Sequence, residues 1–156
     1  MEITDLLTRD RVVLGLAARD KAQVLRALSH RAGKAMGIDG QVVLDALEAR
    51  EDMGSTGVGQ GVAIPHARIG GLQDFFGLFA RLDHPVAFDA IDGQPVDLVF
   101  LLLMPHRAGN TQLAALACVS RLLRDRRVAS SLRAAGTAAE IHQLFSDVDR
   151  QIAHET

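Results

Sequence analysis

The fold class follows from one nearly continuous apolar run, Pro95-Val96-Asp97-Leu98-Val99-Phe100-Leu101-Leu102-Leu103. A strand that faces solvent on one side alternates apolar and polar residues, whereas a strand covered on both faces is apolar almost throughout. The run Phe75–Leu82 has the same character. Two such strands need helices on both faces of their sheet, so the sequence predicts an α/β protein built as a three-layer α/β/α sandwich.

Helical patterns stand on either side of these strands. Asp20 is a suitable N-cap for a helix that Gly33 and Gly37 end, and Asp39 is a suitable N-cap for a helix over Gly40–Asp52. Further predicted elements are a strand at Arg11–Leu14, an extended piece at Val62–Ile64, a turn at Asp83-His84-Pro85, a short strand at Val86–Phe88, a helix capped by Thr111, helices at Arg126–Ala135 and Thr137–Phe145, and a frayed tail after Val148.

Length and composition exclude several classes of protein. The chain has 156 residues, so we expect residues 1–156 to form a single domain with its core at about 3–147. The net charge of −2 argues against a nucleic-acid binder, and the absence of Trp and Tyr leaves few side chains on which bases stack. The single Cys excludes an internal disulfide and a cysteine-cluster metal site.

Neither a signal peptide nor a membrane helix is evident. The segment Met1–Asp5 is acidic, and the longest apolar run, Leu98–Met104, is far shorter than the roughly 20 residues that a membrane helix needs. The sequence therefore predicts a cytoplasmic protein that does not insert into membranes.

A glycine-rich segment, Gly54-Ser55-Thr56-Gly57-Val58-Gly59-Gln60-Gly61, is the first candidate for function. Its glycines allow backbone N–H groups to approach an anion closely. The phosphate-loop template fails, because Gln60 and Gly61 replace the required Lys and Ser/Thr, and the dinucleotide template fails as well. A tight turn that leads into a strand explains the same glycines.

His66 follows this segment directly after Ile64-Pro65, and it is the strongest candidate for chemistry. A neutral imidazole is a good nucleophile that titrates near physiological pH. Arg50, at the end of the preceding predicted helix, brings a guanidinium that grips phosphate oxygens through a two-pronged fork, although an arginine there also complements the helix dipole. Together these residues are suited to forming and holding a phosphohistidine.

The other histidines have no residues beside them in the sequence that suggest chemistry. We expect solvated or structural roles for His30, His84, His142 and His154. His106 is a weaker second candidate, because it follows the second apolar strand and would lie at the same sheet edge as His66. Cys118 falls within an apolar helical pattern and is expected to be part of the core.

These residues also carry a family resemblance. The segment Arg50–Ala67, with its Gly-rich stretch and its Val-Ala-Ile-Pro-His-Ala ending, resembles the active-site signature of the type 2 (mannitol/fructose-type) IIA proteins of the bacterial phosphotransferase system. The segments Val86–Leu103 and Ala114–Arg124 resemble that family too, and the likeness covers about residues 3–147.

The resemblance implies a mixed sheet within the α/β/α fold. It implies that His66 accepts a phosphoryl group from an HPr-like phosphocarrier and that Arg50 is the family's active-site arginine. We expect Ser55, Thr56 and Gly57 to support the phosphoryl group, with no metal or other cofactor. The stand-alone length is most similar to the nitrogen-regulatory branch of the family. That branch implies the carrier NPr as donor and regulated partners such as potassium-transport or metabolic regulators.

One position departs from the family pattern. Gln112 stands where the family usually has a second histidine near the start of the helix after the last strand. We expect Gln112 to support the phosphoryl group, because an amide donates a hydrogen bond to a phosphate or to His66, although it cannot carry a proton. His106, six residues upstream, is the candidate to fill this gap. Two alternatives therefore stay open: a sugar-specific IIA subunit that passes phosphate to a IIB/IIC permease, and a non-catalytic binding module with the same fold.

Overall fold

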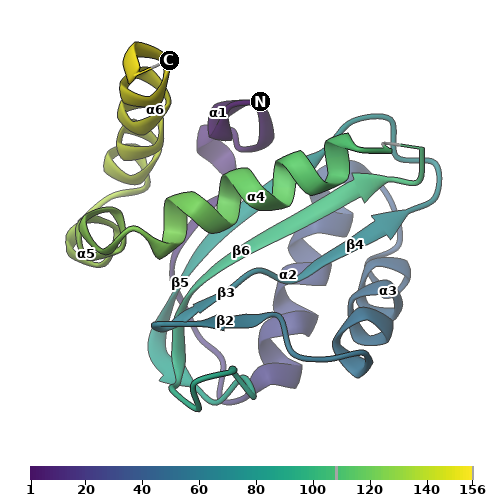
Figure 1. Cartoon of the computed structure of the whole chain (residues 1–156). Helices are drawn as coiled ribbons and strands as arrows, with labels where there is room; N and C mark the ends of the chain where they lie inside the picture. The colour runs from purple at the N-terminus through teal and green to yellow at the C-terminus, as the bar shows by residue number, and fades with distance from the viewer. Residues whose placement is uncertain (108, 156) are drawn as a thin grey trace.

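The computed structural model describes residues 1–107 and 109–155. The chain forms one mixed, six-stranded sheet with helices on both faces (Figure 1). The strands are β1 Val12–Leu16, β2 Gly57–Gly59, β3 Val62–Ala63, β4 His66–Ile69, β5 Phe76–Val86 and β6 Val96–Pro105. The helices are α1 Ile3–Leu6, α2 Lys21–Met36, α3 Gly40–Asp52, α4 Thr111–Arg124, α5 Arg126–Ala134 and α6 Ala138–Glu155, with a 3₁₀ turn at Arg9–Arg11.

Strand β6 lies in the middle of the sheet. The strand order is β1-β5-β6-β3-β2, and β4 also pairs with β6. Strand β5 is antiparallel to β6, whereas β3 and β4 are parallel to it and follow one another along its other edge, at Leu98–Val99 and at Leu102–Pro105. The segment that joins β3 to β4 therefore runs along β6, and it places His66 next to Leu102.

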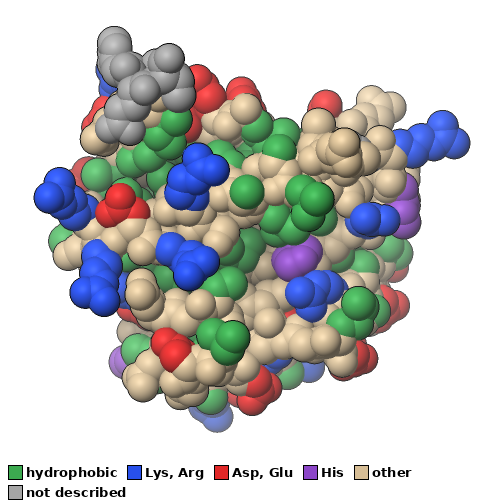
Figure 2. Space-filling model, in the orientation of Figure 1, with side chains coloured by type: hydrophobic (Ala, Val, Ile, Leu, Met, Phe, Trp, Pro, Cys, Tyr) green, Lys and Arg blue, Asp and Glu red, His purple; other side chains and the backbone are tan. Residues whose placement is uncertain are grey.

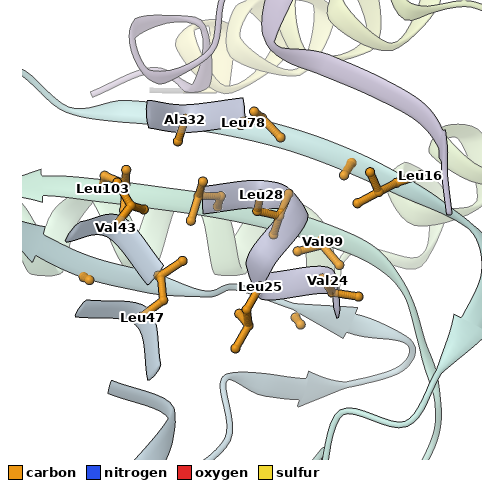
Figure 3. Close-up of a cluster of buried hydrophobic side chains, with 14 of the residues drawn as sticks. Leu16, Val24, Leu25, Leu28, Ala32, Val43, Leu47, Leu78, Val99 and Leu103 are labelled. Carbon is orange, nitrogen blue, oxygen red and sulfur yellow. The ribbon is translucent and has the colours of Figure 1, made fainter. Parts of the chain in front are cut away.

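The side chains of β6 alternate between two hydrophobic cores. Val99, Leu101 and Leu103 pack with α2 and α3 on one face (Figure 3). Leu98, Phe100 and Leu102 pack with α1, α4, α5 and α6 on the other face. All six of these side chains are fully buried, so the prediction of a three-layer α/β/α sandwich from an all-apolar strand is confirmed.

Both acidic N-caps are confirmed. Oδ1 of Asp20 accepts the N–H of Gln23 at 2.8 Å, and Oδ1 of Asp39 accepts the N–H of Gln41 at 2.9 Å. These bonds satisfy amides that have no partner within their helices. The cap predicted at Thr111 is wrong, because Thr111 is the first residue of α4 and its N-cap is Asn110.

Two glycines in α2 have different roles. Gly37 ends the helix in the left-handed conformation with φ 71°, as predicted. Gly33 does not end the helix but lies within it, because α2 continues to Met36. A Cβ on Gly33 would stand 2.8 Å from the backbone Cα of Gly40, so this glycine permits the close packing of α2 on α3.

The strand predicted at Phe75–Leu82 is longer in the structure. Strand β5 continues through Asp83-His84-Pro85, where we expected a turn, and the separate strand Val86–Phe88 does not form. Strand β1 pairs with β5 only as far as Leu82. Pro85 therefore lies where no β1 neighbour requires its missing amide, and a proline is tolerated there.

The last helix is also longer than predicted. Helix α6 runs to Glu155, where the sequence indicates a frayed tail after Val148. Asp149 is 8% exposed and accepts the backbone N–H groups of Ile3 at 2.9 Å and Thr4 at 3.1 Å. Helix α6 is thus hydrogen-bonded to the start of α1 through Asp149. Within the described part of the chain, no helix is both long enough and apolar enough to cross a bilayer.

Candidate functional site

The Gly-rich segment forms a β-hairpin. Gln60 and Gly61 lie between β2 and β3 with φ of 58° and 80°, as in a type I′ turn. This is the tight turn leading into a strand that the sequence left as an alternative. The hairpin brings Thr56 next to Ile64, whose N–H donates to the carbonyl of Thr56 at 3.0 Å.

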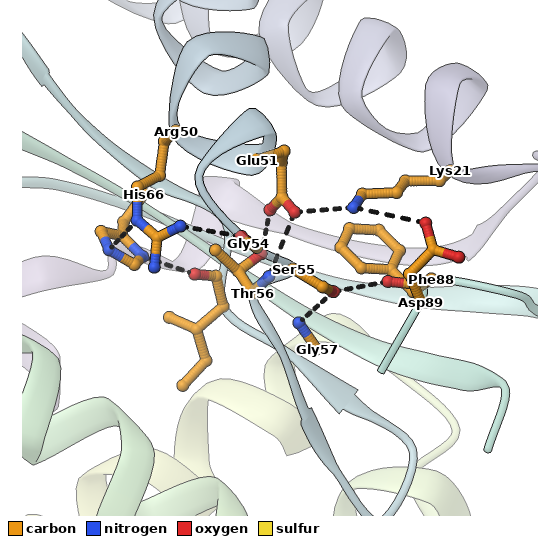
Figure 4. A network of polar contacts seen from close by, with 11 residues as sticks. Lys21, Arg50, Glu51, Gly54, Ser55, Thr56, Gly57, His66, Phe88 and Asp89 are labelled. Atoms are coloured by element: carbon orange, nitrogen blue, oxygen red, sulfur yellow. Dashed lines mark hydrogen bonds and ion pairs between the residues drawn. The ribbon is translucent and has the colours of Figure 1, made fainter. Parts of the chain in front are cut away.

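His66 is the first residue of β4, and its ring is half-buried. Its Nδ1 lies 2.8 Å from the carbonyl oxygen of Ile64. A carbonyl oxygen only accepts, so Nδ1 carries the hydrogen and donates it. The lone pair is then on Nε2, which accepts the Nε–H of Arg50 at 3.2 Å (Figure 4). Both contacts favour one tautomer, in which Nε2 is the nucleophilic nitrogen.

The surroundings of His66 keep its ring neutral. Burial lowers the pKa of the imidazole below its ordinary value of 6.5, and the positive charge of Arg50 lowers it further. The Ile64 carbonyl and the negative charge of Glu51 oppose this shift. The pKa remains lowered in total, so the lone pair on Nε2 is available at neutral pH.

Arg50 lies in the last turn of α3, as predicted, and its guanidinium is fixed at two points. Besides the bond to His66, its Nη1 donates to the carbonyl of Gly54 at 2.8 Å. A guanidinium has five N–H donors, so these contacts leave donors for the oxygens of a group bound to Nε2. The structure therefore joins the two residues that the sequence singled out as a pair.

Ser55, Thr56 and Gly57 lie beside this pair but bond to one another and to other segments. The Ser55 hydroxyl donates to the carbonyl of Phe88 at 2.5 Å and accepts the N–H of Gly57 at 3.0 Å. The Thr56 hydroxyl donates to a carboxylate oxygen of Glu51. Each hydroxyl has one hydrogen, and both hydrogens are used in these bonds.

Glu51 is the residue of this site that the sequence reasoning missed. Its side chain is only 6% exposed, and its carboxylate pairs with Nζ of Lys21 at 2.8 Å (Figure 4). The signal was present in the spacing, because Glu51 follows the buried Leu47 by four residues and so lies on the same, inward face of α3. An acidic residue at an inward position indicates a buried partner.

Gln112 is bonded to the end of β6, and His106 lies away from the ring of His66. Gln112 is 6% exposed, and its Nε2 donates to the carbonyl of Pro105 at 2.9 Å. Because Pro105 pairs with Ile69, His106 lies beside Gly70, four residues along β4 from His66, which corresponds to about 13 Å along a strand. The structure does not bring His106 to the pair formed by His66 and Arg50.

The other histidines whose side chains the structure describes have no comparable surroundings. His30 and His84 are exposed, His142 is half-buried on α6, and the side chain of His154 lies outside the described residues. Cys118 is half-buried rather than part of the core, because its sulfur reaches the carbonyl of Met1 at the edge of α4. Among the described residues, no cluster of His, Cys, Asp and Glu could hold a metal ion.

The open face around the site is cationic and apolar. Figure 2 shows a histidine in a hollow near the middle of this face, with a Lys or Arg side chain next to it. Arg68 follows His66 by two residues on β4 and is exposed, so the two share one face of the strand. Three large apolar side chains are exposed: Met53 after α3, Ile91 in the turn that contacts the hairpin, and Leu113 on α4, at 82%, 87% and 72% exposure.

The chain is similar to known proteins in sequence and in fold. Residues 5–148 match the family described as phosphoenolpyruvate-dependent sugar phosphotransferase system, EIIA 2. The chain is 46% identical over 146 residues to a nitrogen regulatory protein of Bradyrhizobium diazoefficiens, covering 94% of this chain and 95% of that one. It is 38% identical to a nitrogen regulatory protein of Escherichia coli K12, over 96% and 92% of the two chains. The crystal structure of the nitrogen regulatory protein IIA-Ntr of Neisseria meningitidis superposes with a TM-score of 0.87 at 34% identity, covering 92% and 98%.

Proposed function

Because this chain belongs to the EIIA type 2 family of the phosphotransferase system, we propose that it is a nitrogen-regulatory IIA protein that accepts a phosphoryl group on Nε2 of His66. The donor is an HPr-like phosphocarrier of the NPr type. The observation that supports this most strongly is the pair of contacts on the ring. Nδ1 donates to Ile64 and Nε2 faces Arg50, so the reactive lone pair and a phosphate-binding cation meet at one atom.

The transfer is a displacement at phosphorus between two imidazoles. The lone pair of Nε2 forms the new N–P bond while the N–P bond of the carrier breaks, and that electron pair returns to the carrier's imidazole. The hydrogen on Nδ1 stays bonded to Ile64, so the phosphorylated ring of His66 becomes an imidazolium, and the carrier's phosphorylated ring, which starts as an imidazolium, leaves as neutral imidazole. Charge builds on the equatorial oxygens of the phosphoryl group, and the Nε–H of Arg50 turns from the ring nitrogen to one of these oxygens.

Ser55 and Thr56, which follow Arg50 in the chain, have a structural role beside the site. The hydroxyls of Ser55 and Thr56 are engaged elsewhere, so they hold the backbone of the hairpin and leave the phosphoryl oxygens to Arg50. Gln112 is bonded to Pro105 and has no proton to transfer.

The regulatory role is supported by the relatives named nitrogen regulatory protein. The exposed side chains of Met53, Ile91 and Leu113 provide apolar contact area for a docking protein. The phosphoryl group changes the charge at His66, so partners distinguish the two states. We propose that the protein acts in the cytoplasm, and that its partners are potassium-transport or metabolic regulators.

A phosphorylation assay tests this proposal. The purified chain is incubated with phosphoenolpyruvate, enzyme I and the NPr-type carrier, and its mass is measured before and after acid treatment. We expect one acid-labile phosphoryl group, lost in His66→Ala and kept in the matched variant His106→Ala. Normal phosphorylation of His66→Ala contradicts the proposal. Absence of any transfer to the intact protein favours the non-catalytic module, and fast onward transfer to a sugar-specific IIB domain favours the sugar-uptake subunit.

A further inference from the structure

We propose that Glu51 is a positioning residue for His66, and that it acts through a chain of hydrogen bonds that fixes the tautomer of the imidazole. This inference rests on the proposed function, because it concerns how the same histidine is made ready for transfer. Glu51 does not touch the ring nitrogens and is therefore not a catalytic residue.

The chain of bonds has three links. The Glu51 carboxylate accepts both the N–H of Thr56, at 3.1 Å, and the Thr56 hydroxyl. The carbonyl of Thr56 accepts the N–H of Ile64 at 3.0 Å. The carbonyl of Ile64 accepts the Nδ1–H of His66 at 2.8 Å. The position of the oxygen that selects the tautomer thus depends on Thr56, and Glu51 anchors Thr56 twice.

Glu51 is itself held firmly. Nζ of Lys21 lies 2.8 Å from its carboxylate and 4.9 Å from the centre of the Phe88 ring. A buried charge is tolerated only when it is paired and its oxygens are hydrogen-bonded, and both conditions are met here. Figure 4 shows that the network joins α2, α3, the hairpin and the segment after β5, so Thr56 is fixed to two helices rather than to a free loop.

Loss of this anchor has a chemical consequence beyond stability. When the Nδ1–H bond to Ile64 is loosened, only the Nε–H of Arg50 still favours the Nδ1–H tautomer, so part of the population carries its hydrogen on Nε2. A hydrogen on Nε2 blocks attack on phosphorus and opposes the Nε–H of Arg50. The negative charge of Glu51 also partly offsets the lowering of the His66 pKa by Arg50.

The test compares Glu51→Gln with Glu48→Gln. Glu48 is exposed and lies three residues earlier on α3, so the control removes the same charge from the same helix without touching the network. Imidazole ¹⁵N shifts are measured on the unphosphorylated proteins. We expect Glu51→Gln to show a mixture of tautomers and to accept phosphate at least about tenfold more slowly, because small errors in positioning slow transfer strongly. Glu48→Gln should match the wild type in both.

A second variant protects the test against a folding failure. Thr56→Val removes the hydroxyl bond to Glu51 and keeps the side-chain volume, so it should show the same mixture of tautomers to a smaller extent. A pure Nδ1–H tautomer in whichever of these variants fold overturns the positioning role. The tautomer is read without any phosphoryl donor, so a wild-type protein that never accepts phosphate refutes the proposed function separately.

Discussion

Arg50 is the residue whose replacement most directly tests the proposed chemistry. Arg50→Gln removes the Nε–H that faces Nε2 of His66 at 3.2 Å and the bond to Gly54 at 2.8 Å. A preorganised donor to an oxygen that gains charge in a transition state is worth about 10²–10³ in rate, or about 2.7–4 kcal/mol. We expect Arg50→Gln to slow phosphoryl acceptance by that factor. Arg50→Lys should fall between it and the wild type, since lysine keeps the charge and loses the fork.

The assay is single-turnover quench flow with the phosphorylated carrier in excess. The free energy of unfolding of Arg50→Gln serves as a control. It should change only slightly, because the half-exposed hydrogen bonds of Arg50 contribute only about 0.5–1.5 kcal/mol each to folding. The pKa of His66, followed by NMR, should rise in Arg50→Gln, since a positive charge that lowers it is removed while burial remains. A rate within about threefold of wild type in a folded Arg50→Gln protein refutes the role given to this arginine.

Three further predictions concern the ring and the packing. The rate of phosphoryl acceptance by His66 should fall at low pH with a midpoint below 6.5, because burial lowers the pKa of the ring. Initial rates corrected for the carrier measure this midpoint, and a midpoint at or above 6.5 contradicts the prediction. Gly33→Ala puts a Cβ 2.8 Å from the backbone of Gly40, so it should lower the free energy of unfolding, measured in urea, by about 1–3 kcal/mol. Gly136→Ala is the control: the nearest atom to its Cβ is 3.8 Å away, so the free energy of unfolding should change little. Equal stability of those two variants would show that the contact is relieved at no cost. Asp149→Asn weakens the cap on α1 and should cost about 1–3 kcal/mol and speed proteolysis near the N-terminus; unchanged cleavage speaks against this tie.

The layers of the fold were predictable because they depend on local rules. An all-apolar strand must be covered on both faces, and β6 is such a strand. Asp20 and Asp39 begin helices because a short side chain with an acceptor satisfies an exposed amide, whatever the rest of the chain does. The pair of His66 and Arg50 was predictable from residue chemistry and from the family resemblance, and the structure joins them by a hydrogen bond.

The features that were not predicted depend on contacts between segments that lie far apart in the sequence. Gly33 resembles a helix end in sequence, but its role is set by Gly40 across the helix pair. Pro85 resembles a turn, but the strand passes through it because β1 has already ended. Glu51 gains its importance from Lys21, thirty residues earlier in the chain, and from Thr56 on the hairpin. No local pattern states which of these partners will meet.

The central claim is that Nε2 of His66 is the atom that accepts the phosphoryl group. Long-range ¹H–¹⁵N correlation spectra of the ¹⁵N-histidine-labelled protein, recorded before and after phosphorylation, test it most directly. We expect an Nδ1–H tautomer before transfer and a phosphoryl group on Nε2 of His66 afterwards, with the other histidines unchanged. A phosphoryl group on Nδ1, or on any other histidine, contradicts it.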